Sequence, residues 1–276
     1  LHHGIDETGA EMPLYAKSLG VHKNPVFVYS SMIPIALFDL SEWSVRLTSA
    51  VYGWLTILAV FWLLFEMHGT VAGLIGALLI TVLPWNFHFS RVAFELITWP
   101  CIFTFGLAAM VRGCRKGGWI WLIAGLCMGL SLHSYIMAMA FLPLFLPVFA
   151  ILYIKDILRN WKWVTAGFIV FVLLVVPAVL HQLDTRDTLH YQSANWWAQS
   201  TEQPLEQRLE RLWSQYHPFF GKEFLVKTGD NNARHSLNHH GPIYNSLFYL
   251  SIAGIVLTLF PFRKFYWILL TWSALY

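Results

Sequence analysis

The sequence predicts an all-α, polytopic membrane protein, a helical bundle with external juxtamembrane helices and loops. Hydrophobic residues make up 57% of the chain and charged residues only 12%, whereas soluble domains carry about 25% charged residues. Trp (14 residues) and Tyr (11 residues) are abundant, as expected where helices cross membrane–water interfaces. The formal net charge of +3 gives no indication of nucleic-acid binding. Together these observations indicate an integral membrane protein.

The apolar runs along the chain predict about seven or eight transmembrane helices, because a helix needs about 20 residues to cross a bilayer. The chain begins with Leu and stops inside an apolar run. We therefore expect one transmembrane domain over residues 1–276 that is an internal piece of a longer protein. The predicted spans cover 44–65, 70–88, 92–111, 118–135, 137–154, 163–181 and 243–261, and an eighth run begins near 265.

Basic residues in three short connections predict the orientation. The connections at 112–118, 155–162 and 262–264 hold eight of the 18 basic residues and alternate along the spans. By the positive-inside rule these connections are cytoplasmic. The first loop (1–43) and the late loop (182–242) are then external, together with the short turns near 86–91 and 133–136. We expect the functional site on this external side.

The stretch "PWNFHFSRVAFE" (84–95) places two charges at the start of a predicted span. An ionisable residue at membrane depth is costly and is commonly functional. Arg91 and Glu95 are four positions apart, so one interpretation is an interfacial ion pair on a helix surface. The other interpretation is a polar site at the mouth of a cavity, which the external charges favour.

The first loop, "GIDETGAEMPLYAKSLGVHKNPVFVY", holds Asp6, Glu7 and Glu11, followed by Lys23 before Asn24-Pro25. Paired carboxylates can supply a general base, and a lysine can bind a phosphate as a point charge. The alternative, which spacing alone favours, is a solvated juxtamembrane segment with ordinary surface charges.

The late loop contains "GDNNARHSLNHHGPIY" (229–244), with turn-forming residues followed by a basic cluster. We expect Arg234 to contact a phosphate or a sugar hydroxyl group. His235 and His239 are spaced to bind a metal if helical, but Gly and Pro favour a loop. Upstream, residues 202–216 form an amphipathic pattern. It predicts a helix that lies on the membrane surface or packs on the external face of the protein.

A short external turn, "LHSYI", lies between two predicted spans and contains His133 and Tyr135. A single histidine in such a turn is usually a hydrogen-bonded interfacial residue. Tyr135 also suits the aromatic belt of a membrane protein. Neither residue alone indicates a site.

Several blocks together resemble a known family. "TGAEMPLYAKSLGVHKNPVFVYSSMIPIALFDLSEWSVRLTSAVYG" is similar to the first external loop of bacterial and archaeal relatives of the dolichyl-phosphate-mannose–protein mannosyltransferases. "LPWNFHFSRVAFE" is similar to their Pro-Trp-x-x-x-x-Ser-Arg-x-x-x-Glu hairpin, and "GDNNARHSLNHHGPIY" to a late-loop stretch. These relatives have the GT-C fold of polytopic glycosyltransferases. The resemblance covers nearly the whole chain.

The resemblance implies an inverting transferase that takes a sugar from a polyprenyl-phosphate donor and passes it to a protein, lipid or glycan acceptor on the external face. An external carboxylate would activate the acceptor hydroxyl. The candidates are Asp6, Glu7 and Glu95, although the primary acidic pair of the family lies upstream of the stretch matched here. We expect no redox cofactor and no metal. The expected contacts to the donor and its phosphate are Lys23, Arg91, His133, Tyr135, Asp230, Arg234 and His235.

Two other classes compete with this interpretation. A transporter or flippase for a lipid-linked or anionic substrate also places charges at membrane depth, but such proteins favour internal repeats and helices broken near the midplane. The sequence shows no repeat. A non-catalytic membrane scaffold would leave the external charges unexplained.

Overall fold

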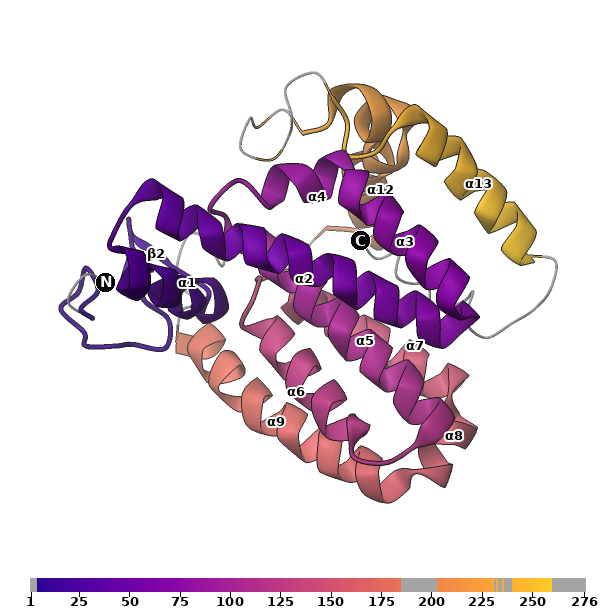
Figure 1. Ribbon diagram of the computed structural model, residues 1–276, viewed down its shortest axis with the longest axis horizontal. Helices are drawn as coiled ribbons and strands as arrows, with labels where there is room; N and C mark the ends of the chain where they lie inside the picture. The colour runs from indigo at the N-terminus through magenta and orange to yellow at the C-terminus, as the bar shows by residue number, and fades with distance from the viewer. Residues whose placement is uncertain (1–3, 185–202, 231, 233–234, 236–239, 260–276) are drawn as a thin grey trace.

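The computed structural model describes residues 4–184, 203–230, 232, 235 and 240–259. This part of the chain is almost entirely helical and forms a bundle of roughly antiparallel helices (Figure 1). The prediction of an all-α membrane fold is confirmed. The helices are α1 (Pro25–Phe38), α2 (Glu42–His68), α3 (Thr70–Val82), α4 (Pro84–Phe89), α5 (Thr98–Lys116), α6 (Ile120–Leu132), α7 (Ala138–Leu152), α8 (Ile154–Arg159), α9 (Trp161–Asp184), α12 (Leu205–Tyr216) and α13 (Asn245–Leu259).

Shorter elements occupy the loops. A two-stranded antiparallel hairpin of β1 (Lys17–Ser18) and β2 (Val21–His22) lies in the first loop. The 3-10 helix η1 (Glu95–Ile97) leads directly into α5, and the late loop contains η2 (His217–Phe220) and the π-helical turn η3 (Glu223–Thr228).

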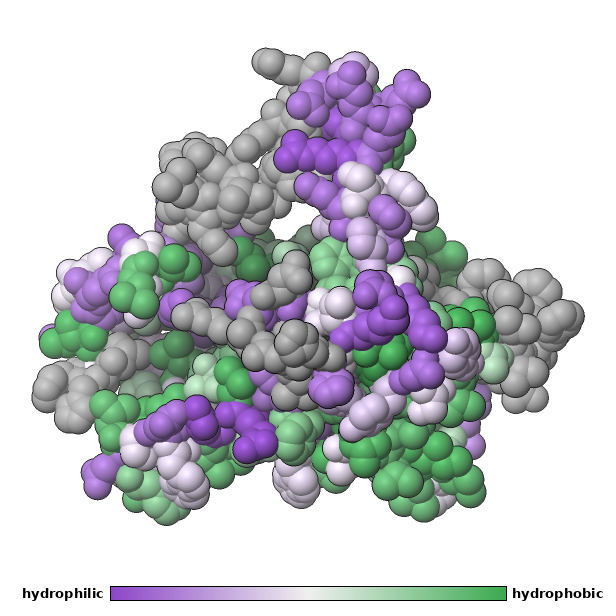
Figure 2. All heavy atoms as spheres, turned by 90° about the horizontal axis from the view of Figure 1, so that it is seen from above, coloured by the Kyte–Doolittle hydropathy of each residue, from purple (hydrophilic) through white to green (hydrophobic). Residues whose placement is uncertain are grey.

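Three of the described helical segments are long and apolar enough to cross a bilayer: α2, η1 with α5, and α9. The other four of the first seven predicted spans hold shorter apolar helices, of 13 residues in α3 and α6 and 15 residues in α7 and α13. The eighth predicted run, near 265, lies outside the described residues. Large apolar side chains are exposed along these helices; Leu78 is 66% exposed and Leu173 is 67% exposed. Figure 2 shows such apolar side chains beside hydrophilic ones on one face of the molecule. A surface of this kind suits contact with lipid.

The predicted span at 70–88 is not one helix. The chain breaks at Leu83, whose extended backbone (φ −66°, ψ 126°) precedes Pro84. A residue before proline is pushed out of the helical region, and proline then begins the next helix because it needs no N–H partner there. The span predicted at 92–111 likewise begins only at Glu95.

The elements sort to two ends of the bundle. Figure 1 shows α1, the β1–β2 hairpin and α4 at the end opposite α8. The last turn of α5 and the α5–α6 connection, which together hold the basic stretch 112–118, are at the α8 end. The basic stretch 155–162 covers α8 itself. The third basic stretch, 262–264, lies outside the described residues.

The core lies around α5, which packs between α2 and α6. Aromatic side chains of α5 and α7 stack along this core; Phe103 makes edge-to-face contacts with Phe141 and Phe145, both with ring centroids 5.2 Å apart. The helices α6 and α9 approach most closely at Gly125 and Gly167. A Cβ at Gly125 would lie 1.9 Å from Gly167 O, so both positions require small residues, as membrane helix contacts often do.

An ion cluster that the sequence analysis missed ties α2 to α5. Glu66 is 2% exposed, and its carboxylate lies 2.5 Å from Arg112 Nη1 and 3.5 Å from Arg115 Nη1. Arg115 also donates to the main-chain oxygen of Glu66. The first predicted span ends at residue 65, whereas α2 continues to His68, so the sequence alone does not place Glu66 inside a helix.

Candidate active site

Three segments far apart in the sequence meet around Glu95. The Asn24 N–H of the first loop donates to Glu95 Oε2 over 3.2 Å. Next to Glu95, the ring of Phe94 contacts the ring of His235 from the late loop, with centroids 5.3 Å apart. His235 Nδ1 in turn lies 3.0 Å from Asp230 Oδ2. These contacts connect Glu95 directly to the first loop, and its neighbour Phe94 to the late loop.

The local sequence explains why the Glu95 carboxylate lies at this position. The helix α4 ends at Phe89, and residues 90–94 are not helical, with Phe94 fully extended (φ −135°, ψ 132°). Glu95 then begins η1 and the long helix α5, where the positive end of a helix dipole stabilises a carboxylate. Thr98 Oγ1 donates to Glu95 O over 2.6 Å and closes this first turn. Beneath it, Phe27, Phe89 and Ile97 form a buried apolar cluster.

Tyr135 lies in the turn between α6 and α7 and completes the cluster. Burial is the largest cause that raises the pKa of its hydroxyl, and the charges of Glu95 and Asp230 raise it further. Its ring packs beside Trp99, with centroids 6.5 Å apart. The hydroxyl therefore remains protonated near two carboxylates and can act as a hydrogen-bond donor.

Lys23 and Arg91, the two predicted phosphate-binding cations among the described residues, lie in different environments. Lys23 is half-buried, and its main-chain N–H donates to Ala16 O over 2.9 Å. Among the residues that the structure describes, its ammonium group forms no ion pair. Arg91 is exposed, and its guanidinium lies 5.0 Å from the centroid of the Phe87 ring.

The interpretation of Arg91 and Glu95 as a helix-surface ion pair is wrong. The chain between them is not helical, so the spacing of four positions does not place the two side chains on one helix face. The described residues show no ion pair between the two side chains. Arg91 instead stacks on Phe87 of α4.

The family model described as dolichyl-phosphate-mannose-protein mannosyltransferase matches residues 22–181, which is more than half of the chain. The chain belongs to this family. The matched range includes Lys23, Glu95 and Tyr135, whereas Asp230 and His235 lie beyond it. No curated protein and no solved structure matches the chain significantly.

Membership of the mannosyltransferase family has a direct consequence for the fold and the activity. The protein is an integral membrane protein and a glycosyltransferase that acts on lipid-linked sugar donors. The resemblance to this family is thereby confirmed over residues 22–181, and the late-loop block at 229–244 lies beyond the match.

The first two acidic residues of this mannosyltransferase-family chain shape the first loop. The Asp6 carboxylate accepts hydrogen bonds from Thr8 Oγ1 at 2.6 Å, Thr8 N at 2.8 Å, Ala10 N at 3.1 Å and Lys17 N at 3.1 Å. The bond from the Thr8 hydroxyl, followed by that from Lys17 N–H, holds the pKa of Asp6 well below its usual range. Glu7 Oε1 accepts from Gly20 N over 2.9 Å. Both side chains therefore hold the β1–β2 hairpin in place.

His133 is buried and uses both ring nitrogens within the protein. Nε2 lies 2.8 Å from Leu174 O in α9, and Nδ1 lies 2.7 Å from the hydroxyl of Tyr15. A carbonyl oxygen can only accept, so Nε2 carries the proton and Nδ1 accepts from Tyr15. Burial lowers the pKa of His133, which favours this neutral form. The sequence analysis missed Tyr15, because its partner lies 118 positions away.

The late loop contains no metal site in its described part. The described residues contain no group of three or more His, Cys, Asp and Glu side chains that could bind a metal ion. His235 contacts Asp230 and Phe94. Arg234 and His239 lie outside the described residues. The amphipathic helix α12 leaves Leu209 (51%) and Trp213 (71%) exposed, so the described part of the protein does not cover its apolar face.

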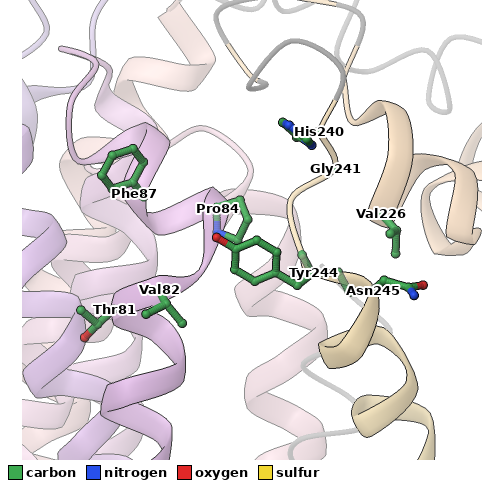
Figure 3. Close-up of a pocket in the computed structure, with 10 residues that line it drawn as sticks. Thr81, Val82, Pro84, Phe87, Val226, His240, Gly241, Tyr244 and Asn245 are labelled. Carbon is green, nitrogen blue, oxygen red and sulfur yellow. The ribbon is translucent and has the colours of Figure 1, made fainter.

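A cavity of about 660 Å³ lies on the other side of α4. Figure 3 shows Pro84 and Phe87 on one side of it, and His240 and Tyr244 on the other. The Trp85 N–H donates to Pro242 O over 3.2 Å and joins the two walls. Because Arg91 stacks on Phe87, a positive charge lies beside this mostly apolar cavity.

Proposed function

We propose that the protein transfers a hexosyl or mannosyl-like sugar from a polyprenyl-phosphate donor to an acceptor on the extracytoplasmic face of a prokaryotic cell membrane. Inversion at the sugar C1 accompanies the transfer. The observation that supports this proposal best is the meeting of Asn24, Glu95 and the Asp230–His235 pair at one end of the bundle. A donor with a charged head and an apolar tail needs its site at such an interface.

The reaction exchanges one bond for another. The acceptor oxygen bonds to C1 as the bond between C1 and the phosphate oxygen breaks, and a carboxylate takes the acceptor proton. The polyprenyl phosphate leaves with one more negative charge than it carried in the donor. Lys23 is the residue that stabilises this charge, and it adjoins Asn24 at the Glu95 carboxylate. Fixed cations in a poorly hydrated site stabilise developing charge more strongly than water does.

Glu95 is the carboxylate best placed to act as the base. Asp6 is the weaker candidate, since four hydrogen bonds from the loop engage its carboxylate and depress its pKa. Glu7 is exposed and bonds to the hairpin. Glu95 is half-buried beside Tyr135, whose protonated hydroxyl can donate to the donor phosphate or sugar.

The remaining residues contribute to donor binding in this proposal. Asp230 and His235 contact sugar hydroxyl groups, and Arg234 contacts the phosphate. Arg91 attracts the phosphate head group at the rim of the cavity between α4 and the start of α13, while the apolar walls there accept part of the lipid chain. The reaction as written requires neither a metal nor a redox cofactor.

The decisive experiment compares Lys23→Ala with Lys17→Ala in purified full-length protein. Lys17 lies in the same hairpin, in β1, and its side chain has no role in the proposed reaction. Each protein is incubated with an acceptor and with a polyprenyl-phosphate donor that carries labelled mannose, glucose or aminoarabinose. The release of polyprenyl phosphate and the appearance of the label in the acceptor are measured. We expect Lys23→Ala to abolish transfer and Lys17→Ala to retain it. Equal turnover in the two variants contradicts the phosphate role of Lys23. Movement of the lipid-linked sugar across the bilayer without transfer supports a flippase instead.

A further inference from the structure

His133 holds the first loop at two points that flank Lys23. On one side, the Tyr15 hydroxyl donates to His133 Nδ1 over 2.7 Å. On the other side, the Val26 N–H donates to His133 O over 3.2 Å. Val26 lies in the first turn of α1, where main-chain N–H groups have no partner within the helix. Lys23 lies between these two anchors, at the end of the β1–β2 hairpin.

The same turn also supports Glu95. Thr98 Oγ1 lies 2.6 Å from Glu95 O and 3.3 Å from Ser134 O, the carbonyl that follows His133. His133 itself is 4% exposed and is fixed to α9 through Leu174 O. Residues 133–134 are therefore a common support for the loop that carries Lys23 and for the helix start that carries Glu95.

We propose that Tyr15 and His133 are positioning residues, whose hydrogen bond holds Lys23 in place relative to Glu95 before the donor binds. This inference rests on the proposed function and replaces the earlier expectation that His133 contacts the phosphate. Both ring nitrogens of His133 already bond to the protein, so neither is available to an incoming phosphate. Its influence on the donor passes through the first loop.

The geometry allows the hydrogen bond to be removed with little other change. The Tyr15 ring stacks on the His181 ring, with centroids 3.8 Å apart and planes 3° from parallel. Tyr15→Phe retains this stacking and the buried volume, and it removes only the hydroxyl. His133→Gln is a second route, because its amide nitrogen can still donate towards Leu174 O while no acceptor remains at the position of Nδ1.

The expected kinetic effect depends on the fraction of free enzyme in which the first loop holds Lys23 in its binding position. Loss of a buried hydrogen bond that leaves a polar partner unsatisfied destabilises the loop conformation that the bond holds. A free enzyme that holds the loop correctly only part of the time binds donor more weakly in proportion. We therefore expect Tyr15→Phe to raise the KM for the donor about tenfold and to change kcat less than about twofold, because bound donor restores the loop. Loss of a direct phosphate contact would lower kcat instead.

The test uses full-length protein and two independent measurements. The first is steady-state transfer by Tyr15→Phe and His133→Gln, with Tyr216→Phe in the exposed part of α12 as the matched control. The second is amide hydrogen exchange of Lys23 and Val26, whose N–H groups bond to Ala16 O and His133 O. We expect both variants to raise KM and to accelerate exchange at these two amides, and the control to do neither.

The inference is overturned by a fall in kcat at unchanged KM, or by unchanged exchange at Lys23 and Val26 in both variants. A general loss of folded protein with normal KM in the remainder also overturns it, since that result indicates a purely structural role. If the wild-type protein transfers no sugar from any donor, the proposed function fails. The exchange measurement still decides whether the hydrogen bond holds the loop.

Discussion

The buried Glu66 provides a quantitative test of how the bundle is held together. The substitution Glu66→Ala removes a carboxylate that is 2% exposed and leaves Arg112 and Arg115 without it. The carboxylate joins α2 to α5, two of the long helices at the centre of the fold. Its loss should destabilise the whole bundle rather than one helix end.

The structure sets the size of the effect. Removal of one partner from a buried ion pair costs about 3–5 kcal/mol, because the other charge remains in a poorly hydrated place. Here Arg112 is 35% exposed and Arg115 is 48% exposed, so water can reach the guanidinium groups that remain. We therefore expect a loss near the lower limit, about 3 kcal/mol in the free energy of unfolding.

The matched control is Glu42→Ala in the same helix. Glu42 pairs with Arg46 at 2.5 Å and four positions apart, but these side chains are 77% and 55% exposed. An exposed pair of this kind, at the first turn of a helix, contributes at most about 1 kcal/mol. Unfolding of both variants by a denaturing detergent in mixed micelles gives the comparison. If Glu66→Ala costs no more than Glu42→Ala, the argument from burial is refuted.

Three further predictions follow from particular contacts. Glu95→Gln should lower kcat by about 10²–10⁴ in a transfer assay if its carboxylate is the base, whereas Asp6→Asn should mainly weaken the first loop, visible as faster amide exchange at Thr8 and Ala10. Burial lowers the pKa of His133 below 6.5, so as the pH falls this histidine is protonated in the unfolded chain before it is protonated in the folded protein. The free energy of unfolding should therefore fall as the pH drops below about 6.5, and His133→Gln should make that pH dependence weaker. Gly125→Ala should cost about 1–3 kcal/mol in stability, since its Cβ would collide with Gly167 O, while Gly254→Ala, with open space around it, should cost nothing measurable in the same unfolding assay.

The hydropathy of the sequence predicted the helical class and the places of the membrane helices. All seven predicted apolar segments contain a helix, because a run of about 20 apolar residues has few other stable structures in a bilayer. Boundaries were less predictable. The stretch 70–88 is mostly apolar up to Pro84, so its average hydropathy predicts one continuous helix. Pro84 instead keeps Leu83 out of the helical conformation and ends α3.

The ion cluster at Glu66 was missed for a different physical reason. Its partners Arg112 and Arg115 lie more than 40 positions away and belong to another helix. The spacing of residues along the sequence does not predict an ion pair between two different helices. The same limit applies to Tyr15 and His133, whose hydrogen bond joins the first loop to a turn 118 positions later.

The acidic residues of the candidate site differ in their surroundings in a way that the sequence does not show. In the sequence, Asp6 and Glu7 formed the more obvious pair, and Glu95 stood alone beside Arg91. In three dimensions the hydrogen bonds of the loop engage Asp6, and its depressed pKa makes it a poor proton acceptor. Glu95 instead lies at the start of α5, where the first loop, Tyr135 and the Asp230–His235 pair meet. A base must lie where the substrate groups converge, and that convergence depends on contacts between segments rather than on spacing along the chain.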